Sequence, residues 1–404
     1  MKLKPIINSL LETDAYKFSM GQTIFHRFNR DQTVWSFRCR NRDVRFTPEM
    51  AAEVGEQIDH YCTLSFREDE LSWLNDNLPW ITPDYTDFLR FWHPRREEIH
   101  INEEGMVPYN GCGLAIEAAG TWLSTSMYEI AILAIVNEVY YAFTKGVEAC
   151  RAEFVERTVD KFDRLASGEF DIGTFSEFGM RRRYSSEAQD WLLYYITSLN
   201  LPGFVGTSNV HLARKYGVKA VGTQAHEYIM CVGQGHHENN PAYSNMFAMR
   251  AWVDEYKTRN GIALTDTITT AAFLKDFDLT YATLFSGVRH DSGDPFEWGE
   301  RMIGHYDSLG IDPMSKTLLF SDSLDFAKAT DIRRRFKDRC KVAFGIGTYL
   351  SNPLPCPLNI VMKVTECNGS PVAKLSDVEG KGMCKDPAYV EYLRRAIDWR
   401  LNHG

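Results

Sequence analysis

The stretch Ser286-Gly-Val-Arg-His-Asp-Ser-Gly-Asp-Pro295 joins an apolar run to a polar loop and to the start of a helix. The run over residues 281–288 is typical of a buried strand. Asp294 is a favourable N-cap, Pro295 suits the first helical position, and Gly310 suits the end of the helix. The stretch therefore predicts a strand–loop–helix unit with polar residues at the carboxyl end of the strand.

The same order of strand, loop and helix recurs from about residue 170 onward. Further strands are predicted over residues 201–205, 218–222, 317–320 and 341–344. Each is followed by a loop that contains Gly, Ser, Asp or Thr. Repeated units of this kind predict a parallel α/β sheet or barrel, and such folds bind ligands at the carboxyl ends of their strands.

The first part of the chain has a different pattern. A helix is predicted over residues 14–27 and a strand over residues 33–39, followed by polar, Trp-rich helical stretches. Residues 116–165 are expected to be mainly helical. Near the C-terminus, Asn368-Gly-Ser370 lies between two alternating runs, which predicts a hairpin turn.

Composition and charge argue against several classes of protein. The 404 residues include 54 Asp or Glu and 45 Lys or Arg, so the formal net charge is -9. Nucleic acids and anionic membranes attract basic proteins, so we expect neither as a partner. The nine cysteines form no C-x-x-C pair, and the N-terminus has no long apolar run. A reduced, cytoplasmic protein without a zinc knuckle is expected.

Three loops are the first candidates for a ligand site. Gly206-Thr-Ser-Asn209 and Gly345-Ile-Gly-Thr348 would let backbone amides approach a phosphate, and a plain tight turn is the simpler interpretation. Arg289-His-Asp-Ser-Gly-Asp294 suits a phosphorylated sugar, because Arg can fork onto phosphate and Asp can accept from ribose hydroxyls or hold Mg²⁺. Its alternative is an Asp-capped helix start in which Arg289 pairs with Asp291.

Three other segments carry candidate residues. Phe178-Gly-Met-Arg-Arg-Arg183 combines an aromatic ring with three cations, and a solvated basic turn is the alternative. His226, in Thr223-Gln-Ala-His-Glu227, follows a predicted strand and is expected at the catalytic face, with a structural hydrogen-bonding role as the alternative. Tyr16 and Met20 lie at helical spacing, where a core stripe is the default.

Taken jointly, these segments resemble the nicotinate phosphoribosyltransferase family through almost the whole chain. The motifs that carry the resemblance are Thr13-Asp-Ala-Tyr-Lys-Phe-Ser-Met20, Glu177-Phe-Gly-Met-Arg-Arg182, Gly206-Thr-Ser-Asn-Val210, Gly222-Thr-Gln-Ala-His-Glu227, Ser286-Gly-Val-Arg-His-Asp-Ser-Gly-Asp-Pro295, Phe320-Ser-Asp-Ser-Leu-Asp325 and Phe344-Gly-Ile-Gly-Thr348. The resemblance implies an α/β fold in which an irregular, incomplete TIM-like barrel packs against a mixed α+β domain formed from both chain ends. Residues 1–115, joined by 350–404, would form the α+β domain. Residues 116–349 would form a helical segment and the phosphoribosyltransferase barrel.

Members of this family make nicotinate mononucleotide and diphosphate from nicotinate and 5-phosphoribosyl 1-diphosphate, the first step of NAD synthesis from nicotinate. The resemblance therefore implies a ligase-class enzyme with small-molecule substrates, ATP as co-substrate, Mg²⁺ as cofactor, and an active site completed across a homodimer. The catalytic residues it implies are His226, which ATP would phosphorylate, Asp291 and Arg289. No protein ligand of Mg²⁺ is predicted.

The resemblance also implies a set of substrate-binding residues. They are Tyr16 from the partner subunit, Phe178, Arg181, Thr207, Ser208, Arg289, Asp291, Ser292, Gly293, Ser321, Asp322, Ser323, Gly345, Gly347 and Thr348. The rings of Tyr16 and Phe178 would sandwich the pyridine, and Arg289 would bind its carboxylate. Asp291 would accept from the ribose hydroxyls. The serine loop at 321–323 and the glycine loop at 345–348 would hold the 5'-phosphate.

Three alternatives are distinguishable. Nicotinamide phosphoribosyltransferases are expected to share this fold. The members that resemble this chain have an acidic residue where this chain has Ser208, and a carboxylate there would repel nicotinate. A catalytically silent binding protein would be expected to have lost His226, Arg289 or Asp291, and all three are present. Without the family match, a sugar-phosphate barrel enzyme without ATP coupling is the alternative, and stimulation of ATPase activity by nicotinate would separate it.

Overall fold

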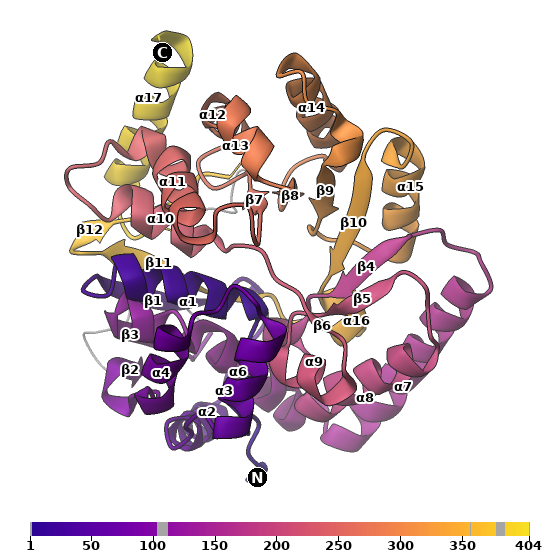
Figure 1. The fold of residues 1–404 in the computed structure, drawn as a ribbon. Coiled ribbons are helices and arrows are strands. Elements are labelled where there is room, and N and C mark those ends of the chain that lie inside the picture. The colour runs from indigo at the N-terminus through magenta and orange to yellow at the C-terminus, as the bar shows by residue number, and fades with distance from the viewer. Residues whose placement is uncertain (1, 103–111, 356, 377–383, 404) are drawn as a thin grey trace.

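Two sheets organise the chain, and each is covered by helices (Figure 1). The computed structural model describes residues 2–102, 112–355, 357–376 and 384–403. One sheet is parallel and has seven strands, and the other has five strands that pair antiparallel. Every helix among the described residues is too short or too polar to cross a membrane.

The parallel sheet is an open barrel. Its strands are β4 (Thr174–Glu177), β5 (Phe204–Thr207), β6 (Lys219–Ala220), β7 (Ile262–Leu264), β8 (Gly287–His290), β9 (Thr317–Phe320) and β10 (Lys341–Ile346). The order β6-β5-β4-β10-β9-β8-β7 follows the chain around a circle, because β10 pairs with β4. The strands that would close the circle, β6 and β7, do not pair in the described part of the chain. The expected incomplete α/β barrel is confirmed.

The helices between these strands bury apolar stripes on the outside of the barrel. They include α8 (Ser186–Ser198), α9 (Val210–Tyr216), α10 (His226–Gln234), α11 (Ser244–Tyr256), α12 (Thr270–Asp276), α13 (Leu279–Leu284), α14 (Pro295–Ser308), α15 (Phe326–Phe336) and α16 (Thr348–Ser351). In α14, the Asp294 side chain accepts from Phe296 N and Glu297 N, and Pro295 occupies the first turn, as predicted. In α15, Phe326 and Phe336 are buried, and Phe336 stacks on Phe320 of β9. Helix packing of this kind leaves the carboxyl ends of the strands free for loops.

The second sheet brings the two ends of the chain together. It has the order β12-β11-β1-β3-β2, with β1 (Gln32–Cys39), β2 (Ile99–Ile101), β3 (Ile116–Thr121), β11 (Ile360–Cys367) and β12 (Ser370–Pro371). Strand β1 pairs antiparallel with β11, so that Phe37 lies opposite Met362. The predicted hairpin is confirmed, because Asn368 and Gly369 take positive φ angles between β11 and β12.

The remaining helices pack around this sheet or on the barrel. They are α1 (Ala15–Arg27), α2 (Pro48–Tyr61), α3 (Glu68–Asn77), α4 (Pro83–Phe91), α5 (Trp122–Thr125), α6 (Tyr128–Thr144), α7 (Val147–Ala166) and α17 (Pro387–His403), with 3-10 turns η1 (Arg96–Glu98), η2 (Met180–Arg182), η3 (Pro241–Tyr243) and η4 (Pro313–Ser315). Helix α6 packs on α2 and β11, while α10 packs on α11 and β11. The His226 helix thus contacts both parts of the protein.

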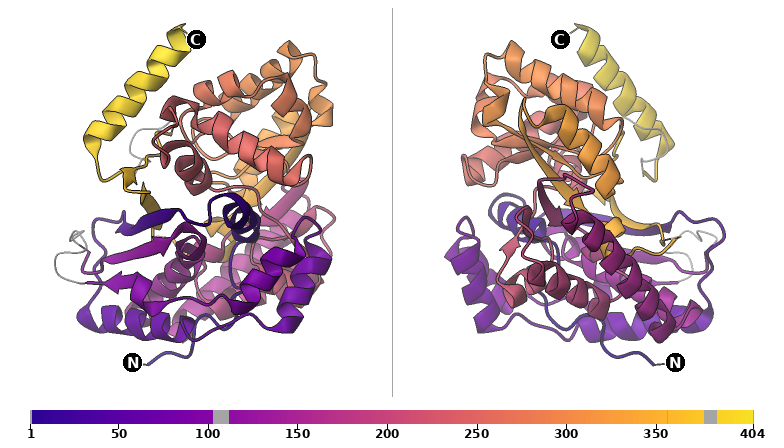
Figure 2. Two further views of the ribbon diagram at one scale, coloured as in Figure 1. Left: turned by 60° about the vertical axis from the view of Figure 1, so that its left-hand side comes forward. Right: turned by 90° about the vertical axis from the view of Figure 1, so that its right-hand side faces the viewer.

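Two segments depart from the expected domain division. Ile116–Thr121, expected in the helical segment, forms β3 of the antiparallel sheet, where it pairs with β1 and β2. The C-terminal helix α17 packs on α12 and η3 at the outer edge of the barrel and away from that sheet (Figure 2). It does so because Leu393 and Ile397 are buried in one small apolar cluster with Ile268 and Ala272.

The strand expected over residues 281–288 is wrong in its first half. Residues 279–284 form α13, because the Asp278 side chain caps this helix by accepting from Tyr281 N. Strand β8 begins only at Gly287. Strands β4 and β7 were not predicted, and β6 has two residues where five were expected. Short strands between helices offer too few residues for a clear alternating pattern.

Candidate active site

A cavity of about 470 Å³ lies where the carboxyl ends of the barrel strands face the antiparallel sheet. The barrel contributes loop residues after β4, β5, β6, β8, β9 and β10 to its wall. The opposite wall comes from β1, through Trp35, and from β11, through Lys363. The cavity therefore occupies the position that the strand–loop–helix pattern predicted for a ligand site.

Most of the expected site residues line this cavity. They are Tyr16, Phe178, Arg181, Ser208, His226, Arg289, Asp291, Ser321, Asp322, Ser323, Gly347 and Thr348. The residues that are absent from its wall are Thr207, Ser292, Gly293 and Gly345. Thr207 and Ser292 are buried and use their hydroxyls to hold neighbouring carboxylates. The structure gives these two residues supporting positions behind the wall.

Glu177 at the end of β4 holds two of the site loops together. Its carboxylate accepts from Gly179 N at 2.6 Å and from the Thr207 hydroxyl at 2.6 Å. Burial raises the pKa of Glu177 to about 7, although these donors act in the opposite direction. Because Phe178 lies between Glu177 and Gly179, this carboxylate fixes the backbone on both sides of the ring that lines the cavity.

Gly345 makes room for the Phe178 ring. A Cβ at position 345 would lie 2.3 Å from the nearest ring atom, which is closer than two carbon atoms can approach. The backbone is also fixed there, since Phe178 N donates to Ile346 O at 2.8 Å. The first glycine of the loop at 345–348 therefore serves the aromatic wall, whereas Gly347 and Thr348 line the cavity.

Tyr16 lines the cavity of its own chain, whereas the family resemblance implies that the partner subunit supplies this ring. Ala15 N donates to Ser208 O at 2.8 Å, and the Ser208 hydroxyl donates to Asp14 Oδ1 at 2.6 Å. A Cβ at Gly222 would lie 2.6 Å from Tyr16 N, so only glycine allows this close approach of the two backbones. The start of α1 is thus bound to the barrel loops of the same chain.

A buried ion-pair cluster secures α1 beneath the cavity. Lys17 Nζ lies 2.8 Å from Glu129 Oε2 on α6 and 2.6 Å from Glu227 Oε2 on α10. All three side chains are almost inaccessible to solvent. Breaking a buried pair leaves an uncompensated charge, which costs several kcal/mol. The cluster therefore fixes α1, α6 and α10 relative to one another beside His226.

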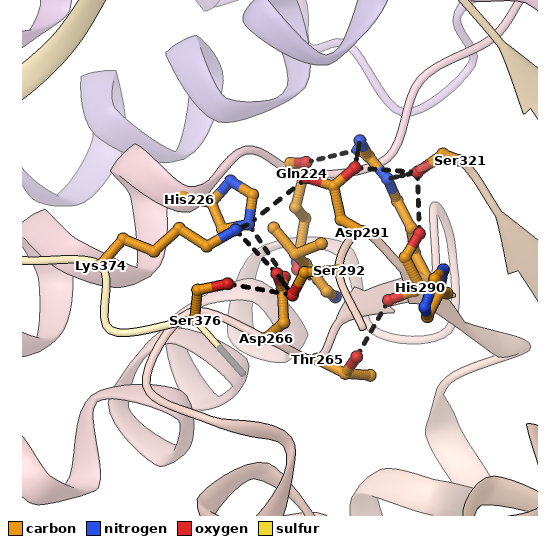
Figure 3. A network of polar contacts seen from close by, with 12 residues as sticks. Gln224, His226, Thr265, Asp266, His290, Asp291, Ser292, Ser321, Lys374 and Ser376 are labelled. Carbon is orange, nitrogen blue, oxygen red and sulfur yellow. Dashed lines mark hydrogen bonds and ion pairs between the residues drawn. The ribbon is translucent and has the colours of Figure 1, made fainter. Parts of the chain in front are cut away.

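His226 is held by an acidic and a basic neighbour (Figure 3). Its Nε2 lies 2.9 Å from Asp266 Oδ1 and 2.8 Å from Lys374 Nζ, and Lys374 Nζ lies 2.7 Å from Asp266 Oδ2. Burial and Lys374 lower the pKa of His226 to about 4, against the opposing effect of Asp266 and Asp291. The imidazole is therefore neutral at physiological pH, with Nε2 as the ring nitrogen that faces both Asp266 and Lys374.

Arg289 is held in place by every nitrogen of its guanidinium group. Nε donates to Ser321 Oγ at 2.8 Å, and NH2 donates to Asp291 Oδ1 at 3.0 Å. NH1 donates to Thr223 Oγ1 at 3.0 Å and to Gln224 O at 3.1 Å. Burial raises the pKa of the Asp291 carboxyl, but Arg289 and His226 outweigh this effect and hold it well below its usual range. Both interpretations of the loop at 289–294 thus apply. Arg289 pairs with Asp291 and Asp294 caps α14, while Arg289 and Asp291 also line the cavity.

Four cations crowd one end of the cavity, and the sequence pointed to two of them, Arg181 and Arg182, through the basic turn at 178–183. The other two are Arg40, which follows β1, and Lys363 of β11. Burial and the neighbouring guanidinium groups lower the pKa of Arg182 to about 9. Burial lowers the pKa of Lys363 to about 8, with Arg181 acting in the same direction and Glu129 against it. Mutual repulsion of this kind favours a multiply charged anion at this end.

Asp266 and Lys374 are the other functional candidates that sequence analysis missed. Asp266 follows the three-residue strand β7, so the Thr265-Asp-Thr267 loop was the available signal once that strand was recognised. Lys374 follows β12, far along the chain, and no local pattern marks it.

The cluster around His226 has the spacing of a metal site but contains its own cation. Ligand atoms of His226, Asp266 and Asp291 all lie within 4.8 Å of one another. The Lys374 ammonium, however, lies between two of these groups at hydrogen-bonding distance. An ammonium and a metal ion cannot share this space, so we assign no metal to these three residues.

Comparisons with known proteins agree with this geometry. The sequence profile of the nicotinate phosphoribosyltransferase (NAPRTase) family matches residues 174–400, and that of the NAPRTase N-terminal domain matches residues 11–137. The nicotinate phosphoribosyltransferase of Cupriavidus necator is 43% identical over 392 residues, which covers 96% of this chain and 98% of the relative. That of Yersinia enterocolitica is 44% identical over 401 residues, with 97% and 96% covered.

Solved structures show the same arrangement of the whole chain. The nicotinate phosphoribosyltransferase of Porphyromonas gingivalis superposes with a TM-score of 0.88 at 36% identity, covering 97% of this chain and all of that one. The enzyme of Vibrio cholerae superposes with a TM-score of 0.89 at 34% identity, covering 97% and 94%. Profiles, sequence identity and fold agree over nearly the full length, and the chain therefore belongs to the nicotinate phosphoribosyltransferase family.

Proposed function

We propose that this protein transfers the phosphoribosyl group of 5-phosphoribosyl 1-diphosphate to nicotinate, forming nicotinate mononucleotide and diphosphate. The observation that carries the proposal is the convergence of three groups on one cavity: two aromatic rings, a clamped arginine–aspartate pair and a neutral histidine. Together they suit a flat heteroaromatic acid, a ribose and a phosphoryl donor. The family membership supports the same reaction.

The aromatic and charged walls divide the work of the transfer. Tyr16 and Phe178 line the cavity from opposite domains of one chain and offer faces on which a pyridine can stack. As the ribose–diphosphate bond breaks, positive charge develops at the ribose carbon, and an ionised Asp291 stabilises that charge. The cations at the other end of the cavity, including Arg182 and Lys363, stabilise the departing diphosphate.

His226 is suited to accept the γ-phosphoryl group of ATP. Asp266 and Lys374 both lie at Nε2, so Nδ1 is the ring nitrogen left open for attack, and it carries the lone pair in the tautomer that has its proton on Nε2. Attack by Nδ1 forms an N–P bond while the bond between the γ-phosphorus and the bridging oxygen breaks, and ADP leaves. The phosphoryl charge then lies beside the substrate cavity, where it can change the relative affinities for substrates and products.

Magnesium would bind at the phosphate loops. Mg²⁺ takes one or two carboxylates together with phosphate oxygens, and Asp322 offers a carboxylate on the cavity wall next to Ser321 and Ser323. The residues present therefore fit this ion. When bound, Mg²⁺ would neutralise charge on the diphosphate.

The substrate preference follows from the charge around Ser208. Its hydroxyl donates to Asp14 Oδ1 at 2.6 Å, and burial raises the pKa of Asp14 against the opposing effect of this bond. Ser208 itself adds no charge, and Arg289 lies on the same cavity wall to attract a carboxylate. The pocket thus favours nicotinate over nicotinamide.

We infer cytoplasmic action, because the cysteine pattern indicates a reducing compartment. A homodimer is also proposed from the family resemblance. Since Tyr16 lines the cavity of its own chain, we propose a dimer in which each Tyr16 stays in its own subunit's active site.

One assay tests the function. The protein is incubated with phosphoribosyl diphosphate, ATP and Mg²⁺, with nicotinate or nicotinamide in parallel, and mononucleotide and ADP are measured. We expect nicotinate mononucleotide together with ADP, and acid-labile label on the protein from γ-labelled ATP. His226→Ala should abolish that label. Product from nicotinamide alone, or label that persists in His226→Ala, would contradict the proposal.

A further inference from the structure

Lys374 lies on a segment that connects the antiparallel sheet to the His226 cluster. Its neighbours are fixed on two sides, since Ala373 N donates to Gln234 Oε1 of α10 at 2.7 Å and Leu375 N donates to Thr267 O at 2.9 Å. From this position the Lys374 side chain extends toward His226 and Asp266 (Figure 3). The ammonium is therefore placed by backbone contacts on either side of it and is not a mobile surface charge.

The charged groups that face the His226 ring come from three elements. Asp266 follows β7, Asp291 follows β8 with Nε2 of His226 at 3.6 Å from its Oδ2, and Lys374 follows β12. Arg289 of β8 is the other nearby cation, but its guanidinium is directed to Asp291 and to three other acceptors. Lys374 is thus the cation in direct contact with the imidazole.

We propose that Lys374 is a positioning residue that keeps the His226 imidazole in its neutral, nucleophilic form across the physiological pH range. The proposal rests on the proposed role of His226 as the phosphoryl acceptor. Asp266 alone would have the opposite effect, because a carboxylate beside a histidine favours the imidazolium ion. An imidazolium has no lone pair with which to attack a phosphoryl group.

The geometry explains how Lys374, together with burial of the ring, opposes the influence of the two carboxylates. Lys374 Nζ donates to Asp266 Oδ2, while Ser292 Oγ donates to the same oxygen at 2.5 Å. The charge of Asp266 is therefore shared with two donors at Oδ2, while its Oδ1 lies 2.9 Å from His226 Nε2. A second proton on His226 would place two cations 2.8 Å apart in a buried site.

The test measures the titration of His226 directly in the absence of ATP. Protein labelled with ¹³C-histidine is followed by NMR from about pH 5 to pH 8.5, and the His226 resonance is assigned by its loss in His226→Asn. In the natural protein we expect no His226 midpoint in this range. In Lys374→Met the midpoint should rise into it, so that imidazolium at a given pH increases about tenfold or more. Lys374→Arg should retain the low midpoint.

Two controls separate this effect from a loss of structure. Lys385→Met removes a lysine of the same C-terminal segment that pairs with Glu117 at 3.0 Å and Glu366 at 3.4 Å, away from the cavity, and should leave the His226 titration unchanged. Thermal unfolding identifies variants that do not fold. A folded Lys374→Met protein with an unchanged His226 midpoint would overturn the proposal. If the Lys374→Met protein does not fold, the His226 titration is measured in Lys374→Gln, and that result decides the proposal.

The consequence for phosphorylation is measured separately. Labelling by γ-labelled ATP should lose rate toward low pH in Lys374→Met and recover toward pH 8.5, whereas Lys374→Arg should follow the natural profile. Equal loss at every pH would also overturn the proposal, since it would mean that Lys374 does not act on the proton. If the natural protein takes no label at all, the proposed function fails, but the NMR titration still decides the role of Lys374.

Discussion

We predict that Tyr16 and Phe178 of one chain form the pyridine site together. Both line one cavity within a single chain, and backbone hydrogen bonds from Ala15 to Ser208 and from His211 to Leu11 tie the start of α1 to that chain's barrel. A stacked aromatic pair contributes about 0.5–1.5 kcal/mol beyond burial. Replacing either ring by alanine should therefore raise the KM for nicotinate by about two- to twelvefold.

Mixing the two variants gives opposite results for the two arrangements. If each chain uses its own rings, every site in a mixture of Tyr16→Ala and Phe178→Ala proteins carries one lesion, whichever chains associate. If Tyr16 crossed between subunits, about half of randomly exchanged dimers would be mixed, and one of the two sites in each would be intact. About a quarter of all sites would then be of the natural type.

The assay is the rate of mononucleotide formation at a nicotinate concentration well below KM. Subunit exchange, if a dimer forms, is verified with differently tagged chains, and a mixture of natural and doubly substituted protein provides the control. We expect the mixture to show the mean rate of the two variants, without recovery. A rate above the mean of the two variants after demonstrated exchange would refute the assignment of Tyr16 to its own chain.

Two further substitutions test the supporting structure. Gly345→Ala would place a Cβ 2.3 Å from the Phe178 ring, so displacement of the ring should raise the nicotinate KM about tenfold. Gly304→Ala, where nothing lies within 4 Å, should leave KM unchanged and serves as the matched control. Arg183→Met leaves the buried Glu12 carboxylate without its partner at 2.8 Å, and urea unfolding should show a loss of about 3–5 kcal/mol. Adding Glu12→Gln should restore part of that stability, and no change in either variant would contradict the ion-pair argument.

Local sequence patterns predicted the parts of the fold that depend on neighbouring residues. The Asp294-Pro295 start of α14 and the Asn368-Gly369 turn were predicted correctly, because caps and turns are decided within a few residues. The apolar pattern over residues 281–288 predicted a strand, and this was wrong in the first half. There the Asp278 side chain caps helix α13. Strand β7 has three residues and was missed, and Asp266 was missed with it.

The sequence by itself determined the class of the barrel and the loops that carry its chemistry. Strand-to-helix periodicity and the residue types after each strand are local properties, and they place Ser208, His226 and Arg289 at one end of the barrel. Tertiary structure alone decided what surrounds them. Lys374 reaches His226 from a segment that lies 148 residues away in the chain, and Tyr16 enters the cavity through contacts between distant backbones. Such contacts depend on how the two sheets pack, which no local pattern records, and they determine the charge and protonation of the site.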